Sequence, residues 1–200
     1  MLFETDRYNA FQITADGFNY NGSSYLFDEI SHLFFSHVLT TQRLNFVKVG
    51  QPESAYLHII LSSHKKLKLS FDESSFFMGL NFNKKKDIKN LVYLYAFLAK
   101  KTFANRLEHY LRQISENGYF VYDDCRFYPN NKIVFRKKEF PVKSSSFMKR
   151  CGYVGMRPKS GIVDKIIWEM SIINLPQFNT ETDHDIIFYL LEKYLGLKWS

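Results

Sequence analysis

The sequence predicts an α+β protein of two units, each a run of antiparallel strands followed by a helix. Over two long stretches, apolar and aromatic residues alternate with polar ones, a period of two that is typical of half-buried strands. After each stretch the apolar period changes to 3.6, which is typical of a helix. The chain has 200 residues, 46% of them hydrophobic and 18% aromatic, so it can bury a sizeable core. We expect the first unit over residues 1–117 and the second over 118–200.

The first strand-rich stretch is predicted over residues 8–72. The segments Ala15-Asp16-Gly17 and Asn21-Gly22-Ser23 punctuate alternating aromatic residues and are turn signals. A further hairpin is predicted where the apolar runs 56–61 and 67–71 flank the polar turn 62–66. Consecutive hairpins of this kind predict a meander of antiparallel strands.

A helix over residues 88–116 has the clearest pattern in the chain. Asp87 is placed to cap its start, and Asn117-Gly118 supplies the left-handed residues at which helices end. A helix of this length spans about 45 Å, which is more than one small sheet needs, so we expect it to bend or to bridge two units. Its apolar stripe comprises Ile88, Leu91, Val92, Tyr95, Leu98, Ala99, Thr102, Phe103, Arg106, Leu107, Tyr110, Leu111 and Ile114.

The second unit repeats this order, with strands over 119–175 and a closing helix over 183–195. Thr182 is the expected N-cap, with Asp185 in the capping-box position, and Gly196 ends the helix. The acids at this helix start are explained by the helix macrodipole, which favours negative charge there.

A repeated spacing suggests that the two units arose by internal duplication. Apolar positions separated by two, five and two residues occur once in each unit, after a polar turn. The positions are Phe18, Tyr20, Tyr25 and Phe27 in the first unit, and Ile133, Phe135, Phe140 and Val142 in the second.

This order of elements resembles the pleckstrin-homology-like (PH-like) superfold as it occurs in small bacterial proteins. The segments that carry the resemblance are 13–20, with 27–30 after the next turn, and 127–135. The resemblance implies two PH-like units, each a bent antiparallel sheet closed by a C-terminal helix. It also implies binding, usually of protein or phosphoinositide, and seldom catalysis.

Phosphoinositide-binding members of that superfold carry basic residues in and beside the first hairpin loop. The first unit has Asp16-Gly17 there and departs from the pattern, whereas the second offers Lys132 and the run 136–138. Binding of a lipid headgroup is therefore an expectation for the second unit only.

Positive charge is concentrated in the middle of the chain. The net charge is +7, but residues 1–31 carry −4 and residues 164–200 carry −3, so the block 32–163 carries +14. Such a block is either a solvated face or a surface for an anionic partner. The candidate partner-binding residues are Lys84, Lys85, Lys86, Arg136, Lys137, Lys138, Lys149 and Arg150.

The sequence carries none of the common catalytic motifs. It has no Gly-rich phosphate loop, no dinucleotide fingerprint, no HExxH and no GxSxG, and its Cys and His spacing fits no structural zinc site. The six histidines are interpreted as ordinary surface or boundary residues. We therefore expect no enzyme, no cofactor and no metal.

The leading hypothesis is a cytoplasmic, non-enzymatic protein-binding module, such as a bacterial immunity protein or inhibitor that neutralises a toxin, nuclease or other enzyme by stoichiometric binding. The chain has no export signal and no apolar run long enough to span a membrane. Its two cysteines, Cys125 and Cys151, are expected to be free thiols in a reducing compartment. The alternatives are binding of nucleic acid or of an anionic membrane through the basic middle block.

Overall fold

The computed structural model describes residues 11–39, 42–44, 47–50, 53–72, 82–141, 147–150, 153–156, 177–179 and 181–196. All strand pairs in this part of the chain are antiparallel, which confirms the α+β class. The chain forms two compact units, Met1–Asn105 and Arg106–Ser200. Their boundary falls inside helix α1 (Phe82–Asn117), so each unit contains part of this helix.

Unit 1 begins with a meander of β1 (Phe11–Ile13), β2 (Gly17–Tyr20) and β3 (Ser23–Leu26), followed by the 3-10 turn η1 (Phe27–Glu29). The turn predicted over residues 21–23 is present at Asn21 and Gly22, and Ser23 already begins β3. Asn21 and Gly22 have positive φ, 49° and 77°, as a two-residue type I′ hairpin requires. Gly17 is needed for a different reason, because a Cβ there would lie 2.0 Å from the carbonyl oxygen of Tyr25.

A second sheet of unit 1 has the order β4-β7-β8. Its strands are β4 (Ile30–Leu39), β7 (Glu53–Leu61) and β8 (Lys66–Asp72), so the predicted hairpin of 56–61 and 67–71 is present with longer strands. Along β7 every second residue is buried, as expected for a sheet with one face in a core. A separate two-stranded ribbon joins β5 (Gln42–Leu44) to β6 (Val47–Gly50).

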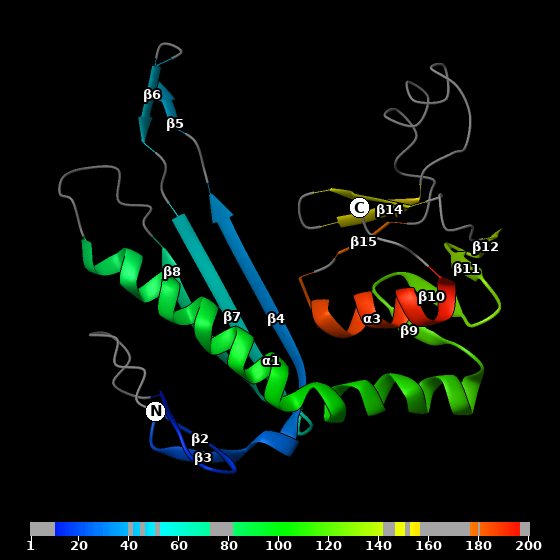
Figure 1. Cartoon of the computed structure of the whole chain (residues 1–200), viewed down its shortest axis with the longest axis horizontal. Helices are drawn as coiled ribbons and strands as arrows, with labels where there is room; N and C mark the ends of the chain where they lie inside the picture. The colour runs from blue at the N-terminus through cyan, green and yellow to red at the C-terminus, as the bar shows by residue number, and fades with distance from the viewer. Residues whose placement is uncertain are drawn as a thin grey trace. The chain divides into compact units, whose positions relative to one another are not determined.

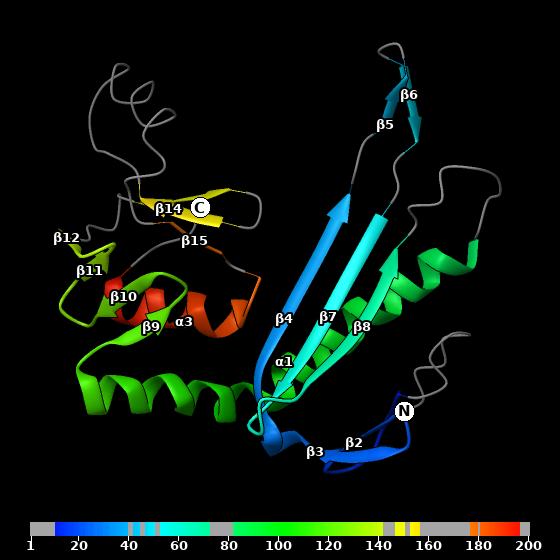
Figure 2. The ribbon, with the colours of Figure 1, turned by 180° about the vertical axis from the view of Figure 1, so that it is seen from behind.

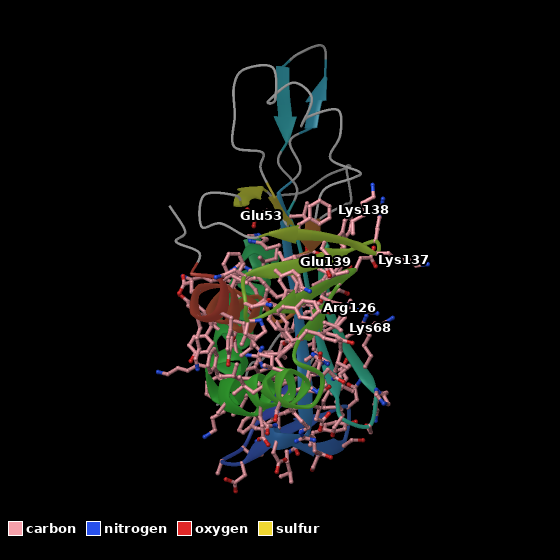
Figure 3. All side chains as sticks on the ribbon, turned by 90° about the vertical axis from the view of Figure 1, so that its right-hand side faces the viewer. Glu53, Lys68, Arg126, Lys137, Lys138 and Glu139 are labelled. Atoms are coloured by element: carbon pink, nitrogen blue, oxygen red, sulfur yellow. The ribbon has the colours of Figure 1, made fainter. Side chains whose placement is uncertain are left out.

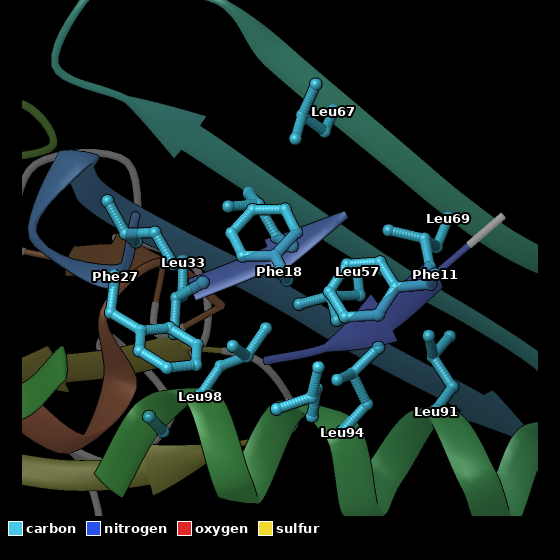
Figure 4. Packing of buried hydrophobic residues seen from close by; sticks show 14 of the residues in the cluster. Phe11, Phe18, Phe27, Leu33, Leu57, Leu67, Leu69, Leu91, Leu94 and Leu98 are labelled. Carbon is cyan, nitrogen blue, oxygen red and sulfur yellow. The ribbon is translucent and has the colours of Figure 1, made fainter. Parts of the chain in front are cut away.

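Helix α1 covers one face of the β4-β7-β8 sheet, since it lies in front of these strands in Figure 1 and behind them in Figure 2. Leu91, Leu94 and Leu98 point from the helix into the core of unit 1, where they meet side chains of both sheets (Figure 4). The helix begins at Phe82 instead of residue 88, so Asp87 lies within it and is not its cap. The apolar pattern misses this first part of the helix because residues 84–86 are lysines. Lysines favour a helix but do not contribute to its apolar period.

Unit 2 contains a four-stranded meander in the order β12-β11-β10-β9 and a three-stranded sheet in the order β13-β14-β15. The strands are β9 (Phe120–Tyr122), β10 (Cys125–Tyr128), β11 (Lys132–Phe135), β12 (Lys138–Pro141), β13 (Phe147–Arg150), β14 (Tyr153–Met156) and β15 (Gln177–Asn179). Helix α3 (His184–Leu195) ends at Gly196 as predicted. Figures 1 and 2 show α3 against one face of the four-stranded sheet.

The repeated spacing of the sequence has a geometric basis in the structure. Phe18 pairs with Tyr25 across β2 and β3, and Ile133 pairs with Phe140 across β11 and β12. In each hairpin a two-residue turn joins the strands, which separates the paired residues by seven positions. Two similar hairpins produce this spacing by themselves, so duplication stays a prediction. Val142, the last position of the second set, lies outside the described residues.

Candidate binding surface

The four-stranded sheet of unit 2 has a buried inner face and an exposed outer face. Residues alternate between them along each strand, and Phe120, Phe127, Ile133 and Phe135 are buried on the inner side. The outer side carries aromatic, cationic and aliphatic residues that are exposed or half-buried. We call this surface the sheet face; it comprises Tyr119, which directly precedes β9, and Val121, Arg126, Tyr128, Lys132 and Val134.

Cations cover both tyrosines of the sheet face. The Arg126 guanidinium lies 5.4 Å from the ring centre of Tyr119, and the Lys132 Nζ lies 4.5 Å from that of Tyr128. The two rings are 5.1 Å apart, so the four side chains form one continuous layer. Cation–π contacts at exposed positions are worth about 0.5–1 kcal/mol each, so they favour this arrangement of the side chains.

The predicted residues Arg136 and Lys137 form the two-residue turn between β11 and β12. Both have positive φ, 48° and 67°, a conformation that favours Gly, Asn and Asp. The Arg136 guanidinium lies 4.9 Å from the ring centre of Phe135. Lys138 is the first residue of β12, and Figure 3 shows Lys137 and Lys138 together at this end of the sheet. The structure therefore brings these three predicted residues together at one hairpin.

The same end of the sheet also carries negative charge. Asp123 and Asp124 form the turn between β9 and β10. Cys125, the first residue of β10, pairs with the last residue of β9, Tyr122, and with the last residue of β11, Phe135. The acidic turn and the basic turn therefore project from the same end of neighbouring hairpins. On β12, the Glu139 carboxylate accepts a hydrogen bond of 3.1 Å from Lys132 Nζ. The sheet thus carries charges of both signs.

The described part of the chain does not place the remaining predicted residues on this surface. Lys84, Lys85 and Lys86 lie in the first turns of α1, and Lys149 and Arg150 end β13. Their side chains lie outside the described residues, so their role in binding stays a prediction.

A buried ion network, which the sequence does not predict, organises the core of unit 2. Arg106 is fully buried and donates through Nη1 to Asp183 Oδ1 (2.8 Å) and to Asp185 Oδ1 (2.9 Å), and through Nη2 to Asp185 Oδ2 (2.6 Å). The Tyr110 hydroxyl donates to Asp183 Oδ2 at 2.9 Å. These contacts connect α1 to the start of α3.

This network corrects the expected cap of α3. The N-cap is Asp183 instead of Thr182, its backbone is left-handed (φ 44°), and its side chain makes no capping hydrogen bond. Both Asp183 and Asp185 direct carboxylate oxygens to Arg106. The acids therefore neutralise a buried guanidinium, and the helix dipole alone does not account for them. The available signal was the presence of Arg106 in an otherwise apolar stripe.

Burial changes the pKa of a few groups in the core of unit 2. It raises the pKa of the Cys125 thiol to about 12 and raises the pKa of Tyr110 and of Tyr122, whose hydroxyl donates to the carbonyl oxygen of Thr182 at 2.6 Å. For Arg106, burial lowers the pKa but the two carboxylates raise it more, so the guanidinium stays charged. A thiol that remains protonated at neutral pH is a poor nucleophile.

No three His, Cys, Asp or Glu side chains among the described residues could hold a metal ion. His58 stacks on Phe34 at 4.8 Å, and its Nδ1 is buried with no hydrogen-bond partner. Burial, with Lys66 and Lys68 nearby, lowers its pKa. His58 is thus a neutral ring in a sheet.

No family model, curated protein or solved structure matches this chain. In the described residues, neither helix combines the length and the apolar character needed to cross a membrane.

Proposed function

We propose that this chain is a non-enzymatic protein-binding module of the cytoplasm that binds its partner through the sheet face of unit 2. Stoichiometric inhibition of a toxin, nuclease or other enzyme, as by a bacterial immunity protein, is the mode of action that this proposal favours. The single observation that carries it is the layer of two tyrosines, Arg126 and the exposed Val121 on one sheet. Tyr and Arg are enriched in protein interfaces and supply most of their binding energy.

The contacts of the two tyrosines favour a protein over a nucleic acid. A single strand binds by stacking its bases on open aromatic faces, but Arg126 and Lys132 lie over Tyr119 and Tyr128. Residues 119–141 also contain three acids beside five bases. Charges of both signs suit a partner with a complementary pattern better than a uniform polyanion.

The sheet face is also stiff, which supports a binding role. Its strands belong to one antiparallel sheet with continuous pairing from β9 to β12. Val121 is 46% exposed, and its backbone N–H donates to Gln113 Oε1 at 2.9 Å, which ties the edge strand β9 to α1. Preorganised surfaces lose little conformational entropy on binding.

The proposal is tested by affinity capture from native-host extracts, with the wild type and an Arg126→Glu variant compared. The expected result is one protein, captured at a ratio near 1:1, whose recovery falls at least about tenfold with Arg126→Glu, because a central interface arginine is reversed in charge. Lys68→Glu is the matched control, since it makes the same charge change on an exposed residue of β8 in unit 1.

Capture of the same protein at equal yield by Arg126→Glu would show that the sheet face is not the interface. Recovery of nucleic acid without protein, in a salt-dependent manner, would instead favour the basic block as a nucleic-acid surface. Sedimentation with anionic vesicles but not with neutral ones would favour the membrane alternative.

A further inference from the structure

Unit 1 carries a second exposed surface, on the part of α1 that faces solvent. Lys89, Tyr93, Phe97 and Lys101 follow one another at intervals of four residues, and we call them the α1 ridge. Tyr93 is 55% exposed and Phe97 37% exposed, and both lysines are exposed. Residues four apart form one of the ridges by which helices pack, and this one is about 18 Å long.

Tyr93 of the α1 ridge is not explained by the core of unit 1, whereas Phe97 lies at the edge of that core. At about 100° per residue, Tyr93 lies about 160° around the helix from the buried Leu91 and about 140° from Leu98, on a side where a helix of this kind is normally polar. Phe97 contacts the ring of Phe27 at 6.0 Å, which fixes one end of the pair. Tyr93 is therefore a large ring on the solvent side of the helix, one turn from a ring that is anchored at the core.

We propose that the α1 ridge binds a helix of a partner protein, one with an apolar centre and an acidic residue toward each end. Lys89 Nζ lies 5.7 Å from the ring centre of Tyr93, and Lys101 Nζ lies 5.6 Å from that of Phe27. The partner's apolar side chains pack beside these contacts on Tyr93 and Phe97. Its acids pair with Lys89 at one end and with Lys101 and its exposed neighbour Lys100 at the other. Ridges of this class pack with the helices crossing at about 50°.

The charge pattern selects this occupant over a second copy of the chain. Two ridges packed in parallel would place Lys89 beside Lys89, and two packed antiparallel would place Lys89 beside Lys101. Both arrangements oppose like charges, which costs binding energy. A partner helix with an acid toward each end can pair with these lysines in either orientation. The inference is independent of the sheet face, because the ridge lies in unit 1 and the sheet face in unit 2.

The test uses two synthetic helical peptides and the full-length chain labelled with ¹⁵N. Each peptide is alanine-rich, with two leucines four residues apart at its centre. One carries glutamates one turn outside the leucines, and the other carries lysines there. We expect the glutamate peptide to shift the amide resonances around Tyr93 and Phe97 and to bind about tenfold more tightly than the lysine peptide, because two exposed charge pairs change from repulsive to attractive.

A charge-reversed variant makes the result specific. Lys89→Glu with Lys100→Glu and Lys101→Glu is expected to invert the preference, so that the lysine peptide binds more tightly. Tyr93→Ser is expected to weaken both peptides at least about fivefold without changing the unfolding temperature, since an exposed ring is removed. Lys68→Glu is again the control that leaves the preference unchanged.

Several outcomes would overturn the proposal. They are a preference that the triple variant does not invert, resonance shifts away from the α1 ridge, and no binding of either peptide at about 1 mM, the weak end of the affinity scale. Tighter binding of an oligothymidylate at the ridge would assign the surface to nucleic acid. A dimer in solution that Tyr93→Ser abolishes would assign it to a second copy.

Discussion

The cores of the two units are built from different chemistry. In unit 1 the described buried side chains are aliphatic or aromatic except for those of Ser36 and Thr102, and none of them is charged. In unit 2 a buried arginine and the carboxylates of Asp183 and Asp185 lie beside the apolar residues of α3 and the four-stranded sheet. Units with a similar order of elements can therefore be held together by unlike interactions.

This difference has a predictable consequence for how each core fails. An apolar core loses stability in proportion to the volume removed from it. A buried ion pair contributes little net stability while complete, but removal of one partner leaves a charge without compensation. Unit 2 should therefore depend more on single residues and on pH than unit 1.

The largest expected effect is loss of structure in unit 2 at alkaline pH. Burial raises the pKa of the Cys125 thiol from 9.0 to about 12 and also raises that of Tyr110 and Tyr122. A raised folded-state pKa means that stability is fully present below the unfolded value and is lost as pH rises through the folded one. Unit 2 should thus weaken progressively above pH 9. In unit 1, the hydrogen bond from Lys65 lowers the pKa of Tyr25. The effect of this group on stability at alkaline pH therefore has the opposite sign.

Hydrogen exchange followed by mass spectrometry between pH 8 and about pH 11 resolves the two units. Protection should fall first in β9–β12 and α3, after correction for the intrinsic pH dependence of exchange. Earlier loss in β4, β7 and β8 would contradict the comparison.

The next largest effect is expected from Arg106→Met. Removal of the guanidinium leaves the buried Asp183 carboxylate without its ion-pair partner and should lower the free energy of unfolding by about 3–5 kcal/mol. Urea denaturation measures this change. Arg112→Met is the control, because Arg112 pairs with Glu108 on the exposed surface at 3.4 Å and should cost less than about 1 kcal/mol. Equal effects of the two substitutions would show that the network is not structural.

Leu57→Ala probes the apolar core in the same way. Leu57 is fully buried on β7, and its truncation should cost about 2–5 kcal/mol through lost burial and the cavity left behind. The loss should be unchanged between pH 8 and about pH 11, the range over which unit 2 is expected to weaken. Leu26→Ala, at a site that is 51% exposed, is the matched control and should cost under about 0.5 kcal/mol.

The smallest effect concerns the two hairpin turns. Asn21-Gly22 suits positive φ, whereas Arg136-Lys137 adopts it at a cost of roughly 1–2 kcal/mol per residue. Arg136→Asn with Lys137→Gly should therefore raise stability, by about 1 kcal/mol after loss of the Arg136 contact with Phe135. The reciprocal Asn21→Arg with Gly22→Lys should lower it. Thermal unfolding measures the stability of both variants. If Arg136→Asn with Lys137→Gly lowers the stability, the positive φ of Arg136 and Lys137 does not strain this turn.

Local patterns predict the local structure well. The period of two predicts the antiparallel hairpins, and Asn117 and Gly196 mark the helix ends as expected. The first turn of α1 is missed because its lysines carry no apolar period. The network is missed because Arg106 and Asp183 lie 77 residues apart, and no local pattern reports a pairing at that separation. Periodicity indicates that Arg106 is buried but not what compensates its charge.

The position of the unit boundary within α1 determines how the protein can be dissected. Asn105 donates through Nδ2 to the carbonyl oxygen of Asp28 in unit 1, and the next residue, Arg106, binds Asp183 in unit 2. A cut between them would expose unpaired backbone groups in the middle of a 36-residue helix. Independent fragments should therefore overlap, with residues 82–117 retained in both, so that each half keeps a complete helix against its own sheet.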